Sequence, residues 1–299
     1  MSRDDVVQAM RMGNGGRGME DSKRGRYPCI SVVIPALNEA ENLPYVLPAV
    51  ANIGAEVILV DGHSDDETTS VARHLMPDVK IVEQLGRGKG NALRCGLAEC
   101  TGDIIVLMDA DGSTDPHEIP RFVDALLAGA DIAKGSRFLD NGRTDDITRL
   151  RRFGNRMLNE VVNQLFQTPF TDLCYGYIAL WRGCLDFFDV DCDGFEVETQ
   201  INLRARKANL KIVEVPSYEH LRLHGASHLN TFRDGWRVLR MIGQEWMSRY
   251  STIKTPGTHR HSYNLAVVSD LTTLGISPEL SPSSSVEHAI AVSESIYAR

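Results

Sequence analysis

The sequence contains no apolar run that approaches the roughly 20 residues needed to cross a membrane. Residues 1–26 are charged and glycine-rich, and they lack the apolar core of a secretory signal. The chain also lacks an excess of positive charge, because its formal net charge is −8, which argues against a general nucleic-acid binder. Its six cysteines include no Cys-x-x-Cys pair, so we expect reduced thiols rather than disulfides. These absences predict a cytoplasmic protein that binds no nucleic acid.

The composition is that of a globular protein with two unusual ends. The apolar fraction of 42% and the charged fraction of 24% are ordinary for a folded domain. Residues 1–27 form a charged, glycine-rich leader, and residues 251–299 form a tail rich in serine and threonine. Such segments bury too little apolar surface to offset the entropy of ordering them. We therefore expect one domain over residues 28–250, a disordered leader and a mostly disordered tail.

Short apolar runs alternate with helical patterns along the predicted domain, which indicates an α/β fold. We expect a doubly wound, mainly parallel but mixed sheet with helices on both faces. Asn38 is expected to cap the first helix, and a later helix is expected to begin near Arg156. The expected strands cover residues 30–34, 56–61, 80–83, 104–108, 131–137, 171–181 and 211–216.

Two aspartates end the most apolar of these runs. Residues 104–108 read as a strand buried on both faces, and Asp109 and Asp111 follow directly. Open α/β sheets bind ligands beyond the carboxyl ends of their strands. Neighbouring carboxylates repel each other unless a cation joins them, and oxygen ligands favour Mg²⁺ or Mn²⁺. An EF-hand would need glycine at Thr114 and glutamate at Pro120. The pattern therefore predicts a clamp for a metal ion and a diphosphate.

A glycine-rich segment, residues 86–91, resembles two nucleotide-binding motifs but completes neither. A dinucleotide fingerprint would need glycine at Asn91, and a Walker A loop would need Ser or Thr at Gly90, directly after Lys89. Arg87 and Lys89 can still offer positive charge to a phosphate or a base. A solvated turn explains the segment equally well, so both interpretations stay open.

The helix expected over residues 231–250 is amphipathic. Phe232, Trp236 and Leu239 belong to an apolar stripe that recurs every three or four residues, with arginines around it. Such a helix can lie on an anionic membrane surface, or it can pack on its own domain. The sequence leaves both interpretations open.

Four segments in this order resemble family 2 glycosyltransferases, which have the GT-A fold. They are residues 31–39, 60–66, 86–91 and 109–111, and the resemblance spans about residues 29–245. Within that family, Gly135-Ser136-Arg137 and the segment from Arg222 to Ser227 resemble polyprenol-phosphate sugar synthases of the dolichol-phosphate mannosyltransferase kind. His228 departs from that pattern, because these enzymes commonly carry lysine there.

The resemblance implies a GDP- or UDP-sugar donor, inversion at the anomeric carbon, and Mg²⁺ or Mn²⁺ as cofactor. Pro35, Asn38 and Glu39 would line the nucleoside pocket, Asp61 would contact the base with help from Lys89, and Asp109 and Asp111 would hold the metal. A histidine, His224 or His228, could complete the metal shell, and we list His224 as the candidate ligand. The donor-binding residues implied are Pro35, Asn38, Glu39, Asp61, Lys89, Asp109, Ala110, Asp111, Arg137 and Arg222.

The resemblance favours polyprenyl phosphate as acceptor, with peripheral contact at the inner face of a membrane. Asp172 and Glu196 are the candidates for acceptor binding or general base, although Glu196 could instead cap a helix. An ionised phosphate acceptor would need no base. The alternatives are a soluble or polysaccharide acceptor, a sugar nucleotidyltransferase, and a non-catalytic binding module.

Overall fold

A computed structural model describes residues 27–187, 189–225 and 231–248. The expected disordered leader, except for Tyr27, and the expected tail lie outside these residues, as does His228. The strands are β1 (Ile30–Ala36), β2 (Glu56–Asp61), β3 (Lys80–Glu83), β4 (Ile104–Leu107), β5 (Ile132–Ser136), β6 (Arg143–Thr144), β7 (Ile178–Trp181), β8 (Ile212–Pro216) and β9 (Tyr218–Glu219). The α-helices are α2 (Leu43–Ala51), α3 (Thr68–Leu75), α4 (Lys89–Ala98), α5 (Ile119–Leu127), α6 (Arg149–Phe166), α7 (Val197–Lys207) and α8 (Thr231–Met247).

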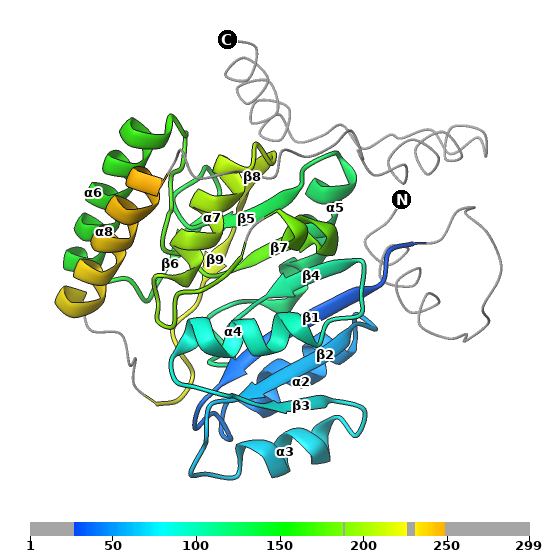
Figure 1. Ribbon diagram of the computed structural model, residues 1–299. Coiled ribbons are helices and arrows are strands. Elements are labelled where there is room, and N and C mark those ends of the chain that lie inside the picture. Colours follow the sequence, from blue (N-terminus) through cyan, green and yellow to red (C-terminus); the bar gives the residue numbers. More distant parts are fainter. Residues whose placement is uncertain (1–26, 188, 226–230, 249–299) are drawn as a thin grey trace, which may run out of the picture.

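The main sheet has seven strands in the order β3-β2-β1-β4-β7-β5-β8 (Figure 1). β7 runs antiparallel to both of its neighbours, β4 and β5, whereas the other neighbouring strands of the sheet are parallel. Helices pack against the sheet, and β6 and β9 form a separate small sheet. The prediction of a mixed, mainly parallel α/β sheet is confirmed.

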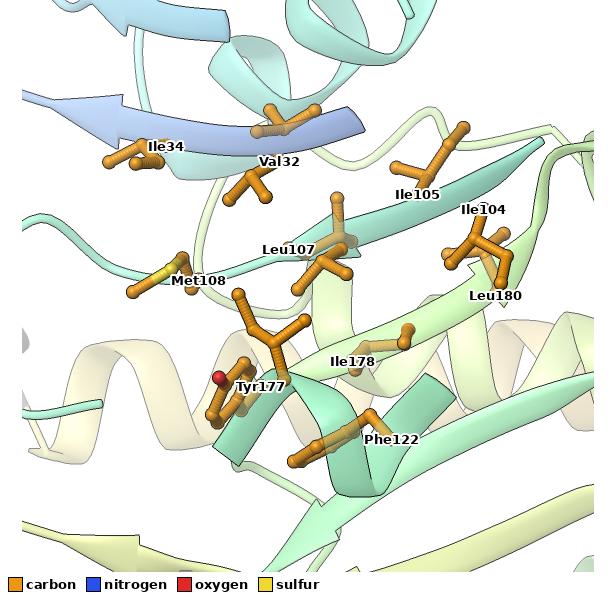
Figure 2. Packing of buried hydrophobic residues seen from close by; sticks show 14 of the residues in the cluster. Val32, Ile34, Ile104, Ile105, Leu107, Met108, Phe122, Tyr177, Ile178 and Leu180 are labelled. Carbon is orange, nitrogen blue, oxygen red and sulfur yellow. The ribbon is translucent and has the colours of Figure 1, made fainter. Parts of the chain in front are cut away.

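The core forms where the sequence is most apolar. All four residues of β4 are buried, and Figure 2 shows Leu107 among side chains from β1 and β7. Tyr177, directly before β7, packs on Phe122 of α5, with ring centroids 4.4 Å apart. A strand covered on both faces must be apolar throughout, which explains the uninterrupted run. This packing fixes the end of β4, where the two aspartates follow.

Three element boundaries differ from the sequence prediction. Asn42, not Asn38, is the N-cap residue of α2, and Asn38 instead adopts a left-handed conformation with φ 57°. α6 begins at Arg149, seven residues before the predicted start, because the Thr148 side chain accepts a hydrogen bond from the backbone of Arg151. β7 begins only at Ile178, because the residues before it form turns and loops beside α6.

A second apolar cluster joins α6, α7 and α8 on one side of the sheet (Figure 1). It includes Val162 of α6, Leu203 of α7, and Val238, Met241 and Ile242 of α8. Within the described part of the chain, no helix is long and apolar enough to cross a membrane. The cluster places α6 and α8 beside the edge of the sheet at which β4 ends.

Candidate active site

A cavity of about 690 Å³ opens at the carboxyl end of β4. One part of its wall comes from the end of β1 and from the loops after β1 and β2, and includes Pro35, Glu39 and Gly62. Its middle contains Asp109, Ala110 and Asp111, as the sequence predicts for a ligand at this edge of the sheet. Its far part lies between α6 and α8, where the lining residues are Ile147, Arg151, Gly154, Asn155, Leu158, Thr231, Asp234, Gly235 and Val238.

Lys89 joins two carboxylates at the centre of the cavity. Its Nζ lies 2.6 Å from Asp109 Oδ1 and 2.7 Å from Glu198 Oε1, and its side chain is only 13% exposed. Burial alone would lower the pKa of Lys89, but the two facing carboxylates outweigh it and raise that pKa. Gly176 leaves room for this pair, because a Cβ there would lie 2.8 Å from Glu198 Oε1 and 2.9 Å from Lys89 Nζ. Lys89 is therefore a fixed positive charge at neutral pH.

Arg222 joins a second pair of carboxylates in the same cavity. Its Nη2 lies 2.7 Å from Asp111 Oδ2, and its Nη1 lies 3.1 Å from Glu39 Oε1. Burial raises the pKa of the Glu39 carboxyl, while Asn42 and Arg222 offset part of that rise. Leu223 donates a backbone hydrogen bond to the carbonyl of Asp111. Gly112, at φ 76°, permits this approach, because a Cβ there would lie 2.6 Å from Leu223 Cδ1.

The donor set of Asp109 and Asp111 fits a divalent ion shared with a ligand. Among the described residues, no group of three or more His, Cys, Asp or Glu side chains could hold a metal ion by itself. Mg²⁺ usually binds one or two carboxylates together with water and substrate phosphates, so two aspartates facing a cavity suffice. Lys89 and Arg222 are bound to four carboxylates, those of Asp109, Asp111, Glu39 and Glu198. This group therefore has two negative charges that its own cations do not balance. A divalent ion would balance them.

Arg137 lines the cavity and is held from behind by Asp172. The two side chains form a bidentate pair, with Nε 2.6 Å from Oδ2 and Nη2 2.9 Å from Oδ1, and Arg137 also binds Glu219. Asn155 and the backbone N–H of Arg137 donate to the same carboxylate. Burial alone would raise the pKa of Asp172, but the contacts with Arg137 lower it below its usual value. Asp172 is fully buried and is not among the residues that line the cavity.

Four other predicted site residues also lie outside the cavity wall. Glu196 precedes α7 and binds Arg237 of α8 at 3.0 Å. His224 lies 3.8 Å from Glu41 and is half-exposed. Asn38 and Asp61 bind the loop after β2, through Ser64 and Asp65. These roles stay predictions, whereas Pro35, Glu39, Lys89, Asp109, Ala110, Asp111, Arg137 and Arg222 all face the cavity.

Close packing requires two of the glycines in the segment 86–91. A Cβ on Gly88 would lie 2.3 Å from the carbonyl oxygen of Asp193, and one on Gly90 would lie 2.0 Å from that of Cys192. The backbone N–H of Gly90 donates to Asp193 at 2.9 Å. The segment therefore packs tightly on the loop before α7, and this contact brings Lys89 opposite Glu198.

Sequence reasoning missed Glu198 and chose Glu196. The two glutamates flank Val197 in the stretch Glu196-Val197-Glu198, so the sequence pattern alone does not show which of them faces the site. Only the start of α7 at Val197 decides that Glu198 turns toward Lys89 and Glu196 toward Arg237. The available signal was Lys89. It lies in a glycine-rich segment but is not followed by the Ser or Thr of a Walker A loop, so a carboxylate partner could be expected for it.

Comparisons with known proteins agree with this geometry. The family model "Glycosyl transferase family 2" matches residues 31–186. The glycosyltransferase AglJ of Haloferax volcanii is 29% identical over 250 residues, which cover 83% of this chain and 79% of that relative. Polyprenol monophosphomannose synthase of Mycolicibacterium smegmatis is 33% identical over 198 residues, which cover 62% of this chain and 75% of that relative.

A solved structure shares the fold. Glucosyl-3-phosphoglycerate synthase of Mycobacterium tuberculosis, in complex with Mn²⁺, UDP-glucose and phosphoglyceric acid, superposes with a TM-score of 0.61. The match has 22% sequence identity and covers 81% of this chain and 88% of the other. The fold is thus that of the GT-A glycosyltransferases, with the aspartate pair at the end of a central strand. The chain belongs to glycosyl transferase family 2, and it is a glycosyltransferase.

Proposed function

We propose that this glycosyltransferase moves a sugar from a GDP- or UDP-sugar to polyprenyl phosphate, with inversion, at the surface of a membrane. The observation that carries the proposal is the shape of the cavity. Its central carboxylates and cations suit a nucleoside diphosphate, and its far part lies between α6 and α8, away from the strand loops. A relative with 33% identity is named a polyprenol monophosphomannose synthase.

In this proposal the chain's own cations receive the donor. Arg222 and Lys89 present positive charge to the diphosphate, and Arg137, fixed by Asp172 and Glu219, presents its guanidinium to the cavity. Asp109 and Asp111 would hold Mg²⁺ or Mn²⁺, which when bound stabilises the negative charge of the departing nucleoside diphosphate. The solved neighbour contains Mn²⁺, which supports this cofactor.

The acceptor end carries arginines that suit a phosphate acceptor, and the two bases predicted for a hydroxyl acceptor lie outside the cavity wall. A hydroxyl must lose a proton to a base within hydrogen-bond reach, whereas a phosphate is already ionised. The two predicted bases, Asp172 and Glu196, do not line the cavity and are bound to Arg137 and Arg237. Arg137 and Arg151, which do line it, suit a phosphate group.

The outer faces of α6 and α8 support peripheral membrane contact. We call them the apolar–arginine surface, because exposed apolar side chains alternate there with exposed arginines. Its members are Arg149, Leu150, Arg152, Phe153, Arg156, Met157, Phe232, Arg233, Trp236, Leu239 and Arg240. The acidic residue within these two stretches, Asp234, is buried, and Glu160, one turn beyond Arg156 on α6, is exposed. Apolar side chains among arginines suit the interface of an anionic membrane.

A donor and acceptor screen tests the proposal. GDP- and UDP-sugars would be offered with Mn²⁺ to polyprenyl phosphate, to soluble phosphorylated acceptors and to oligosaccharides, with and without excess chelator. We expect transfer to polyprenyl phosphate that stops when the chelator is present. Transfer only to a soluble acceptor would replace the acceptor, and full turnover in chelator would refute the metal.

A further inference from the structure

Two glycines face the cavity from the interiors of neighbouring helices. Gly154 belongs to α6 and Gly235 to α8, and both line the far part of the cavity. Glycine destabilises a helix interior, so its presence usually marks a close approach of another chain segment. Here a Cβ added at either position would meet no atom within 4 Å. Packing therefore does not account for either glycine.

The open space is local, because α6 and α8 lie side by side (Figure 1). Val162 of α6 belongs to the same apolar cluster as Val238, Met241 and Ile242 of α8. The helices thus share a packed core toward their C-terminal ends, and the cavity separates them nearer their N-terminal ends. Val238, which belongs to the cluster and also lines the cavity, marks the boundary.

Exposed apolar side chains flank this opening on the outside. Phe153 directly precedes Gly154 and is 62% exposed, and Trp236 directly follows Gly235 and is 67% exposed. Arg151 lies three residues before Gly154 and lines the same wall. A ligand with a charged head and a thin apolar chain would meet an arginine inside the cavity and apolar side chains outside it.

We propose that Gly154 and Gly235 form a slot through which the apolar chain of the acceptor leaves the cavity. The inference rests on the proposed polyprenyl phosphate acceptor and adds the two residues that decide whether a long chain fits. The slot keeps the phosphate inside while the chain lies on the apolar–arginine surface. A side chain at either glycine would occupy the passage but would leave the central carboxylates and cations in place.

The test compares chain lengths in three variants. Gly154→Leu and Gly235→Leu fill the slot, and Gly243→Leu is the matched control. Gly243 also lies in α8 with no atom within 4 Å of a built Cβ, but it does not line the cavity. kcat/KM would be measured with a short, water-soluble isoprenyl phosphate and with a long polyprenyl phosphate.

For the two slot variants we expect kcat/KM to fall about 10-fold or more with the long acceptor and to stay within about twofold with the short one. The control should behave as the wild type with both acceptors. Leucine is a better helix former than glycine, so the melting temperature should not fall. Equal losses with both acceptors, or no loss with the long one, would overturn the slot.

The outcome separates the two proposals. If the wild type transfers no sugar to a polyprenyl phosphate of any length, the proposed acceptor fails and the slot fails with it. If the wild type uses both lengths and the slot variants keep its length dependence, only the slot fails.

Discussion

At the scale of residues, each aspartate of the Asp109–Asp111 pair already binds a cation of the chain itself. Lys89 binds Asp109, and Arg222 binds Asp111 together with Glu39. A metal ion must therefore compete with internal positive charge. A diphosphate that attracts Arg222 would free Asp111, so binding of metal and nucleotide should be mutually favourable.

Arg222→Gln should strengthen the binding of Mn²⁺ alone. Removing the guanidinium leaves Asp111 and Glu39 without their partner, so the site gains negative charge and the Kd should fall about 10-fold. Electron paramagnetic resonance titration of Mn²⁺ without nucleotide measures this. Arg143→Gln, which removes an exposed arginine that binds Asp145, is the control. An unchanged Kd in Arg222→Gln would contradict the competition.

Asp172→Asn should destabilise the fold through Arg137. The variant leaves a buried guanidinium without its bidentate carboxylate, at a cost of about 3 kcal/mol in the free energy of unfolding. The folded-state pKa of Asp172 is lowered from its ordinary 3.8, so its stabilisation is present above that pH and is lost as the pH falls through the folded value. Urea unfolding at pH 7 and at a series of pH values below 3.8 measures both effects. A difference between the proteins that does not shrink as the pH falls below 3.8 would contradict this account.

The sequence predicted those site residues whose position depends on local pattern. Asp109 and Asp111 follow a buried strand, and the end of that apolar run fixes where they emerge. Glu198 and its contact with Lys89 depend instead on where α7 begins and on a long-range approach of two loops. Residues 39 and 222 likewise meet only after the sheet has formed.

At the scale of elements, α8 is attached to α7 by buried charge as well as by apolar contacts. Glu245 of α8 is buried and binds Arg204 at 2.7 Å and Lys207 at 2.8 Å. Near the other end of α8, Arg237 binds Glu196. The wall of the cavity near Gly235 therefore depends on polar contacts made by both ends of the helix.

Glu245→Ala should loosen α8 without unfolding the sheet. Arg204 and Lys207 lose a buried carboxylate, which lowers the local stability of α8 by about 2 kcal/mol. Hydrogen exchange followed by mass spectrometry should show faster exchange in α8 and unchanged exchange in β1 and β4. Equal acceleration everywhere would indicate global destabilisation instead.

Two of the three element boundaries that differed depend on contacts that are remote in sequence. Asn38 was a reasonable cap by residue type, but its bonds to Ser64 and Asp65 hold it outside the helix. The residues before β7 contain apolar side chains that suited a longer strand. They are instead held by Asn155, Asn159 and Asn163 of α6, whose amides bind the backbone there.

At the scale of the whole molecule, charge is unevenly distributed. The chain carries a formal net charge of −8, yet the apolar–arginine surface exposes five arginines, and the exposed Glu160 lies one turn beyond Arg156 on α6. Such a molecule should approach an anionic membrane in one orientation, with the far part of the cavity toward the lipid. The charge of the whole sequence therefore does not decide which partner this face binds.

Trp236→Glu should weaken binding to anionic vesicles. The change places a negative charge within the apolar–arginine surface and removes an exposed indole, so the partition coefficient should fall about 10-fold. Sedimentation with vesicles of phosphatidylglycerol and phosphatidylcholine measures it. Tyr45→Glu, at a residue that is 61% exposed on α2, is the matched control and should bind as the wild type. Equal loss in both variants would contradict a specific membrane face.

Because β7 is antiparallel to β4 and β5, the two ends of these strands differ in how well they tolerate inserted residues. Because β7 begins where β4 and β5 end, the segment that enters it, residues 174–176, reaches the cavity directly. An extra residue between Gly176 and Ile178 would shift the pairing of Ile178 with Leu107 and turn alternate side chains to the opposite face. At the opposite end of these strands, the turn at Gly129 before β5 is open, because a Cβ built there would meet no atom within 4 Å, so this turn can lengthen. New surface features can therefore arise at that end of the strands while the end that lines the cavity keeps its register.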